Sequence, residues 1–179
     1  MILQHLSTHG YDFITVLTWV YCYFKLKTRT SSFSEITKDN GSIFGSIIRL
    51  LNHNYIVDCI WQAHLNGNKH NIVDRNPKNY PVLEELWFLQ QKIDNWYIAY
   101  YDEILSAKLS ERVEFILMSG TCGIMSREEI LAHVVNHCSY HRGFIAEIMY
   151  KIPVQPPVTD FPVFLQGRLW ELFKNDVIF

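Results

Sequence analysis

The sequence predicts an all-α fold, a four-helix bundle followed by a short C-terminal helix. Apolar residues recur at helical spacing in successive segments, polar breaker segments separate them, and strand-like alternation is limited to one short stretch. The 179 residues and the 49% apolar content suit one compact domain with a sizeable core. We therefore expect residues 1–179 to form a single helical-bundle domain.

Start and stop signals delimit the helical segments. The run Asn66-Gly67-Asn68 is a strong stop for the second long helix. Ser126 and Glu129 form a capping box that opens the last long helix, and Pro153 ends that helix. Together with the apolar spacing, these signals place the four long helices and the short last helix at residues 11–25, 42–65, 82–107, 126–151 and 162–174.

Two segments differ from the amphipathic helical pattern. Apolar and polar residues largely alternate in residues 112–118, which predicts a short strand that turns at Ser119-Gly120. The longest apolar stretch runs from Phe13 to Phe24. It is shorter than the roughly 20 residues that span a bilayer, so we expect a buried helix and no membrane partner.

Charge and cysteine content exclude two classes of protein. The formal net charge is −2, and Lys and Arg do not cluster into the basic patch that marks a nucleic-acid binder. The four cysteines are far apart in sequence and form no CxxC pair, so a disulfide framework is not expected in a chain with this much core. We interpret them as reduced thiols in a cytoplasmic protein.

The distribution of histidines points to a metal site. Eight are present, and His133, His137 and His141 follow one another at spacings of four on one predicted helix. Two imidazoles at that spacing are neighbours on the helix surface and can share one ion. Residues eight apart are separated by about 12 Å along the axis. Either the pair His133 and His137 or the pair His137 and His141 should therefore bind a metal.

A third ligand has to come from another helix. The second long helix offers His53 and His64, which share a face but lie about 16 Å apart along the axis, so only one can reach a given ion. His53 is set in an apolar strip and is expected to point inward. His64 is close to the helix end, and we expect it to be solvated.

Other polar residues near these histidines have less specific roles. Cys138 is a rival ligand, although a free cysteine is more often a small buried apolar residue. Asp58, Asn136 and Glu147 could orient the imidazoles by hydrogen bonds, but each is expected to be an ordinary surface residue. The remaining histidines are expected to be satisfied polar groups: His5, His9 and His70.

Three motifs resemble the DinB/YfiT family. The segment His137–Gly143, a histidine followed by three residues and then His-Arg-Gly, is similar to the core of the family signature. The segment Gly41–Ile48, which leads to Asn52-His53, resembles the family's second helix, and Pro156–Asp160 resembles the segment after the last long helix. These matches cover roughly residues 34–165, in the order and spacing of the family.

The resemblance implies a fold, a metal site and two kinds of activity. It implies a bundle with a long crossover connection, frequent homodimers, and a divalent metal ion held by His53, His137 and His141. Some members of the family resemble hydrolases and others resemble transferases of low-molecular-weight thiols. Zinc and nickel both suit imidazole ligands, and the sequence does not separate them.

Three neutral ligands leave an ion with its full charge and an open position. A catalytic zinc site has this form, and it can lower the pKa of bound water to about 7 or hold a thiol as thiolate. We therefore expect a metal-dependent thiol S-transferase or hydrolase, with no separate catalytic residue identifiable. The alternatives are a non-catalytic, metal-binding, dimeric stress-associated bundle protein and a bundle without metal. Arg142 could bind an acidic group of a substrate or form a salt bridge at a surface or an interface.

Two positions depart from the family pattern. Phe144 stands where the family usually has Gln after His-Arg-Gly, which is expected to alter the surroundings of the site. Residues 10–30 do not resemble the family's first helix, because a nearly all-apolar stretch followed by a basic one replaces the amphipathic pattern with Asn and Trp.

Overall fold

The computed structural model describes residues 33–104, 106–152 and 156. Most of these residues lie in helices, and a small two-stranded sheet accompanies them. The helices predicted at residues 11–25 and 162–174 lie outside the described residues, as do His5, His9 and Cys22. No described helix is both long and apolar enough to cross a membrane.

The helix boundaries differ slightly from those predicted. The second helix begins at Ile47 and not at Ser42, because Ser42 and Gly45 pair in an isolated bridge and Gly45 has a left-handed φ of 78°. The third helix ends at Glu103, before residue 107. The described elements are α2 (Phe33–Thr37), α3 (Ile47–Leu65), α4 (Leu83–Glu103), the 3₁₀ helix η1 (Ser106–Lys108), β1 (Arg112–Ile116), β2 (Cys122–Ser126) and α5 (Arg127–Tyr150).

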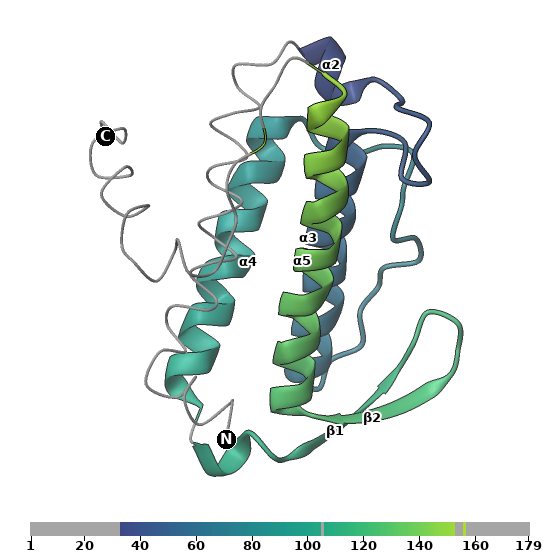
Figure 1. Cartoon of the computed structure of the whole chain (residues 1–179). Coiled ribbons are helices and arrows are strands. Elements are labelled where there is room, and N and C mark those ends of the chain that lie inside the picture. Colours follow the sequence, from purple (N-terminus) through teal and green to yellow (C-terminus); the bar gives the residue numbers. More distant parts are fainter. Residues whose placement is uncertain (1–32, 105, 153–155, 157–179) are drawn as a thin grey trace, which may run out of the picture.

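The three long helices α3, α4 and α5 lie side by side with their axes nearly aligned (Figure 1). Residues 66–82 run back along α3 before α4 begins, so α3 and α4 point in the same direction and α5 points in the opposite one (Figure 1). The order of buried contacts agrees, because the first half of α4 packs with the first half of α3 and the last half of α5. This connection thus crosses the length of the helices.

Two apolar clusters hold the helices together, one toward each end of α3. The first is centred on the fully buried Leu50, Leu86 and Ile145. The second is built around Trp61 and Tyr97, with strand residues from β1 covering it. Burying one such side chain contributes roughly 1.5–3 kcal/mol to the stability of the fold. The two clusters therefore provide most of the free energy that holds the three helices together.

A β-hairpin lies at the C-terminal end of α3. The strand predicted in residues 112–118 is present as β1, and it pairs antiparallel with β2. Gly120, with φ of 85°, makes the turn between the strands. The predicted capping box is confirmed, because Ser126 Oγ accepts from the Glu129 amide at 3.1 Å and the Glu129 carboxylate accepts from the Ser126 amide.

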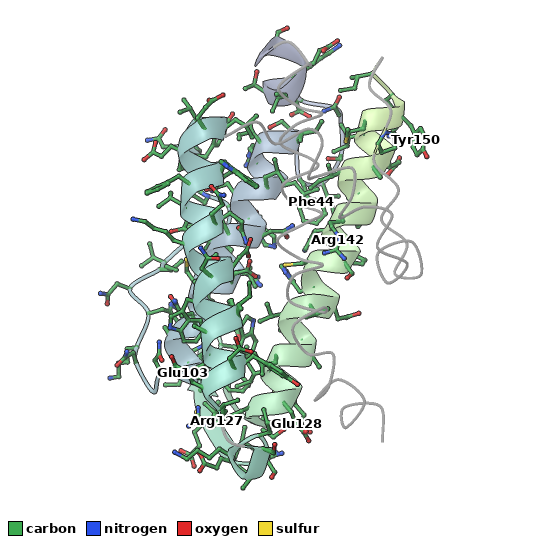
Figure 2. All side chains as sticks on the ribbon, turned by 90° about the vertical axis from the view of Figure 1, so that its left-hand side faces the viewer. Phe44, Glu103, Arg127, Glu128, Arg142 and Tyr150 are labelled. Atoms are coloured by element: carbon green, nitrogen blue, oxygen red, sulfur yellow. The ribbon has the colours of Figure 1, made fainter. Side chains whose placement is uncertain are left out.

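Arg127 joins the ends of all three long helices (Figure 2). Its Nη1 donates to the Leu65 carbonyl oxygen at 2.8 Å and to the Tyr100 hydroxyl at 2.6 Å, and its Nε donates to Glu111 at 3.1 Å. The end of α3, the last turn of α4 and the start of α5 are therefore tied together. This contact fixes the axial position of α5, which carries most of the candidate site.

Candidate metal centre

Three imidazoles meet between α3 and α5. One nitrogen from each of His53, His137 and His141 lies within 4.8 Å of the others. Among the described residues no other His, Cys, Asp or Glu joins this group. We call these three histidines the triad.

The triad forms because two helical spacings meet across one packed interface. His137 and His141 are four residues apart on α5, so they face the same neighbour. His53 is on α3, the helix against which α5 packs. His53 is 5% exposed and His141 is 4% exposed, so both side chains are effectively removed from solvent.

The separation of the ring nitrogens suits ligands of a single ion. The Nε2 atoms of His137 and His141 are 3.1 Å apart. Two nitrogens bound to one tetrahedral zinc at about 2.0–2.1 Å would lie about 3.3–3.4 Å apart. The ring centroid of His53 lies 5.3 Å from that of His137 and 4.8 Å from that of His141.

The crossover connection orients His53. The His53 Nδ1 lies 3.2 Å from the backbone carbonyl oxygen of Arg75. A carbonyl oxygen only accepts, so Nδ1 carries the proton and Nε2 keeps a free lone pair. Metal-bound histidines are usually held in this way by a carbonyl or carboxylate on the other ring nitrogen. Nothing in the loop sequence around Arg75 predicts this contact.

Aromatic side chains surround the outer side of His141. The Phe44 ring makes an edge-to-face contact with His141 at 4.8 Å and with Phe144 at 5.2 Å. Tyr140 packs against both His141 and Phe144. Phe144, the residue that departs from the family pattern, therefore extends an apolar wall around the triad.

Burial keeps the triad uncharged. Burial is the main reason that the pKa of His137 falls to about 3, and repulsion between protonated His137 and protonated His141 or His53 adds to it. Burial likewise lowers the pKa of His141 to about 4 and lowers the pKa of His53. All three rings are therefore neutral at pH 7, which is the form that binds metals.

The chemistry of the donor set fits a divalent metal ion. The Nε2 atoms of His137 and His141 converge at 3.1 Å, and the His53 Nε2 keeps its lone pair because Nδ1 carries the proton. Three neutral imidazole nitrogens are a usual ligand set of zinc and nickel sites. An ion between them would use their lone pairs.

Comparison with known proteins places the chain in a family. The sequence profile of the DinB family matches residues 29–172. The chain belongs to the DinB family. It is also similar to "Protein DinB" from Bacillus subtilis (strain 168), with 26% identity over 134 residues, which cover 69% of this chain and 74% of that protein.

In this DinB-family chain, His133 lies one turn of α5 before His137 and packs against Trp61. His133 lies 5.9 Å from His137 between ring centroids, but its closest aromatic contact is the Trp61 indole at 4.8 Å. It is not part of the triad. Of the two pairs that the spacing on α5 allowed, the structure brings His137 and His141 together with His53.

The prediction that His64 is solvated is wrong. His64 is 7% exposed, because the rings of Trp61 and Phe115 cover it at the end of α3. The hairpin that supplies Phe115 packs against α3, and helical periodicity gives no information about such a cover.

Asp58 is also buried, contrary to the expectation of a surface residue. Its carboxylate accepts hydrogen bonds from Gln90 at 2.9 Å and from the Cys138 thiol at 3.4 Å. Gln90 also donates to Asp94, and burial raises the pKa of Asp58 to about 7. Cys138, the rival ligand, is therefore engaged by Asp58 and stands apart from the triad.

The remaining polar residues on α5 lie away from the triad. Asn136 is exposed, and Glu147 pairs with Lys151 at 2.7 Å on the surface. Arg142 is half-buried and donates to Ser139 Oγ at 2.7 Å. Burial lowers the pKa of Arg142, and the nearby Cys138 and Asp58 partly offset that effect. Arg142 therefore lies close enough to the buried Asp58 for their charges to interact, while its hydrogen bond goes to Ser139.

Proposed function

We propose that the chain is a single four-helix-bundle domain that binds one divalent metal ion through His53, His137 and His141. The observation that carries this proposal is the convergence of three neutral imidazoles, with two Nε2 atoms 3.1 Å apart and the third ring oriented by a backbone carbonyl. Membership of the DinB family supports the bundle and the site.

The donor set favours zinc or nickel. Imidazole ligands suit both ions, whereas carboxylate and carbonyl oxygens suit magnesium and calcium. The triad offers nitrogens only, and no acidic or thiol side chain of the described residues joins them. Three protein ligands would leave at least one position of the ion open.

An open position favours an enzyme, either a metal-dependent thiol S-transferase or a hydrolase. A bound divalent ion would supply Lewis acidity, which lowers the pKa of water or of a thiol. The protein contributes the orientation of the ligands through the Arg75 carbonyl and an apolar wall from Phe44 and Phe144. No residue is assigned as the catalytic acid or base.

A non-catalytic, metal-binding, dimeric stress-associated bundle protein is the alternative. It is supported by the position of the triad, since an ion there would link α3 to α5. Both versions are proposed as cytoplasmic homodimers. The enzyme would act on a small molecule such as a low-molecular-weight thiol, and neither version would bind nucleic acid.

The first experiment is elemental analysis of tag-free protein together with His137→Ala and His141→Ala. The expected result is about one zinc or nickel ion per wild-type chain and none in either variant. His133→Ala is the matched control, because it removes a histidine one turn away that is outside the triad. Wild-type protein that carries no ion and cannot be loaded with either metal would refute the proposal.

Activity assays then separate the two functions. Metal-loaded protein is tested for transfer of a low-molecular-weight thiol to an electrophile and for ester or amide hydrolysis. Turnover that disappears in His141→Ala while the fold persists by circular dichroism supports the enzyme. Metal-dependent stability without turnover supports the structural alternative.

A further inference from the structure

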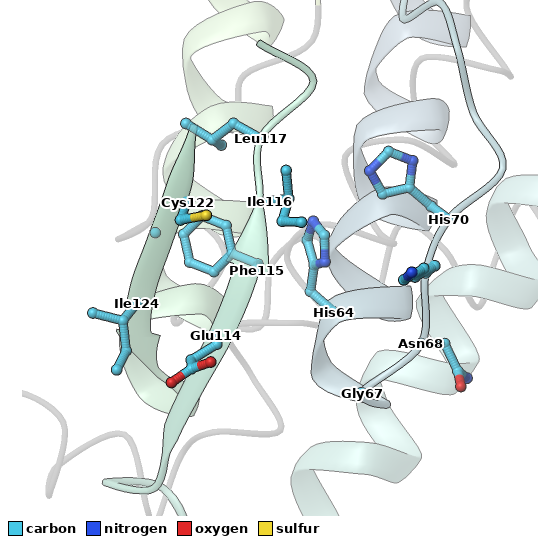
Figure 3. Close-up of a pocket in the computed structure, with 12 residues that line it drawn as sticks. His64, Gly67, Asn68, His70, Glu114, Phe115, Ile116, Leu117, Cys122 and Ile124 are labelled. Atoms are coloured by element: carbon cyan, nitrogen blue, oxygen red, sulfur yellow. The ribbon is translucent and has the colours of Figure 1, made fainter. Parts of the chain in front are cut away.

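A cleft separates the β-hairpin from the end of α3, at the opposite end of that helix from Ile47 (Figure 3). Its volume is about 990 Å³. Phe115, Ile116 and Ile124 form the strand side, while His64 and His70 stand on the helix side. The triad does not line it.

Two imidazoles lie beside one another on the helix side of this cleft (Figure 3). The ring centroids of His64 and His70 are 5.2 Å apart, with the rings nearly perpendicular at 78°. The centroid distances inside the triad run from 4.4 to 5.3 Å, so the spacing of this pair is the same. The pair thus lies in edge-to-face contact at a ring separation like those within the triad.

The backbone holds the two rings together. Gly67 adopts a left-handed φ of 69° directly after α3, and the Gly67 amide donates to the His64 carbonyl oxygen at 2.9 Å. The Asn68 amide donates to the Ala63 carbonyl oxygen at 2.8 Å. This turn reverses the chain, so that His70 returns beside the last turn of α3.

Both imidazoles keep lone pairs for a ligand. His64 is 7% exposed, and burial, together with the neighbouring His70, lowers the pKa of His64, so its ring is neutral at pH 7. The His70 Nδ1 is buried and has no hydrogen-bond partner among the described residues. An unpaired buried nitrogen beside a neutral imidazole is unfavourable unless something binds there.

We propose that His64 and His70 form a second metal site, which takes a borderline divalent cation such as Cu²⁺ and leaves its other coordination positions open to the cleft. Neutral imidazole is a ligand of Cu²⁺, Ni²⁺ and Zn²⁺, and Cu²⁺ binds such sites most tightly of the three. Glu114 and Cys122 also line the cleft and belong to the hairpin. This proposal is independent of the triad.

The test uses Cu²⁺ alone as the probe, by equilibrium dialysis against a weak competing chelator, with bound copper read by elemental analysis and electron paramagnetic resonance. Wild-type protein is expected to bind two equivalents, with nitrogen hyperfine couplings from imidazole in both. His70→Gln and His64→Gln should each lose one equivalent and keep the other. His70 belongs to a connecting segment, so His70→Gln preserves the helix even if His64→Gln unfolds.

Controls separate this site from the triad. Asn68→Ala removes a cleft residue that is not an imidazole, and it should retain both equivalents. His137→Ala should lose the triad's equivalent and retain the one in the cleft. A second equivalent that persists in both His64→Gln and His70→Gln, or wild-type binding of only the ion that His137→Ala removes, overturns the proposal. A single wild-type equivalent that both His64→Gln and His70→Gln lose and that His137→Ala keeps would support the cleft site and refute the triad.

Discussion

The two ends of α3 carry the same residue type on the same face but build different sites. At one end His53 meets two imidazoles from α5 and one backbone carbonyl oxygen. Near the other end His64 meets one imidazole from the connecting segment and two aromatic rings, Trp61 and Phe115. Both histidines are buried, so exposure does not distinguish them.

The difference arises from what packs opposite each histidine. The three histidines of α5 are equally spaced, but its antiparallel register places His137 and His141 against His53 and leaves His133 against the Trp61 indole. Trp61 therefore stands between the two groups of imidazoles. The groups that each of these histidines contacts therefore depend on the element packed against it, and not on its neighbours in sequence.

Removal of Trp61 should have the largest effect. Trp61 is 7% exposed and contacts His64, His133 and Phe115, so Trp61→Ala leaves a cavity and is expected to destabilise the fold by about 3–5 kcal/mol. Urea denaturation measures this change. Phe88→Ala removes a ring that is 56% exposed and should change stability by about 0.5 kcal/mol or less. Equal losses of stability in the two variants would contradict the packing role of Trp61 in the core.

Metal-dependent stability should distinguish the two ends next. At free zinc 100-fold above the dissociation constant of the tighter site, wild-type protein should gain about 2.7 kcal/mol. If the proposed site is correct, His53→Gln should abolish this gain, because it removes one imidazole of the triad, and His64→Gln should keep it. Thermal denaturation with and without zinc checks both variants. A gain that survives in His53→Gln would show that the ion binds elsewhere.

The pH dependence of the metal-free protein should show two opposing contributions. The pKa values of His137 and His141 are about 3 and 4, below that of an unfolded histidine, so their contribution to stability is lost as the pH falls below about 6.5. Asp58, between His53 and His64 in sequence, has a pKa raised to about 7, so its protonated form stabilises the fold at low pH and that contribution is lost as the pH rises toward 7.

Asp58→Asn separates these contributions. Asn resembles the protonated acid and does not titrate, so the loss of stability between pH 7 and pH 5 should be steeper than in wild type, by up to about 1.4 kcal/mol per pH unit for one proton. Urea denaturation of chelator-treated protein across this range provides the slopes. His137→Gln should make the slope shallower. Identical slopes in wild type and Asp58→Asn would contradict the titration of Asp58.

The smallest effect is expected from the capping box at the hairpin end. Ser126→Ala removes the acceptor for the Glu129 amide and should destabilise the fold by about 1 kcal/mol, whereas Ser126→Gly should cost only about a few tenths. Chemical denaturation measures both. The metal content of the triad should not change in either variant, because His137 lies three turns from the cap. Loss of metal in Ser126→Ala would show that the two ends are coupled.

The sequence alone determined the helices, the cap and the candidate ligands. Apolar spacing and breakers located α3, α4 and α5 to within a few residues, and local side-chain chemistry identified the Ser126 capping box. The spacing of four on α5 restricted the candidate ligands on that helix to two pairs, and the resemblance to the family favoured His137 and His141 with His53. These features depend on residues close together in the chain, which is why they can be read from it.

Tertiary structure decided what each buried group contacts. Helical periodicity states which face of a helix is apolar, but not which residue of another element lies opposite. Three contacts depend on the axial register between segments that are distant in sequence. The hairpin buries His64, Gln90 and Cys138 enclose Asp58, and the Arg75 carbonyl oxygen accepts a hydrogen bond from His53. The two apolar clusters and the hydrogen bonds of Arg127 set that register. The packing energy of the clusters is a sum over many contacts between distant residues, so no local sequence pattern predicts it.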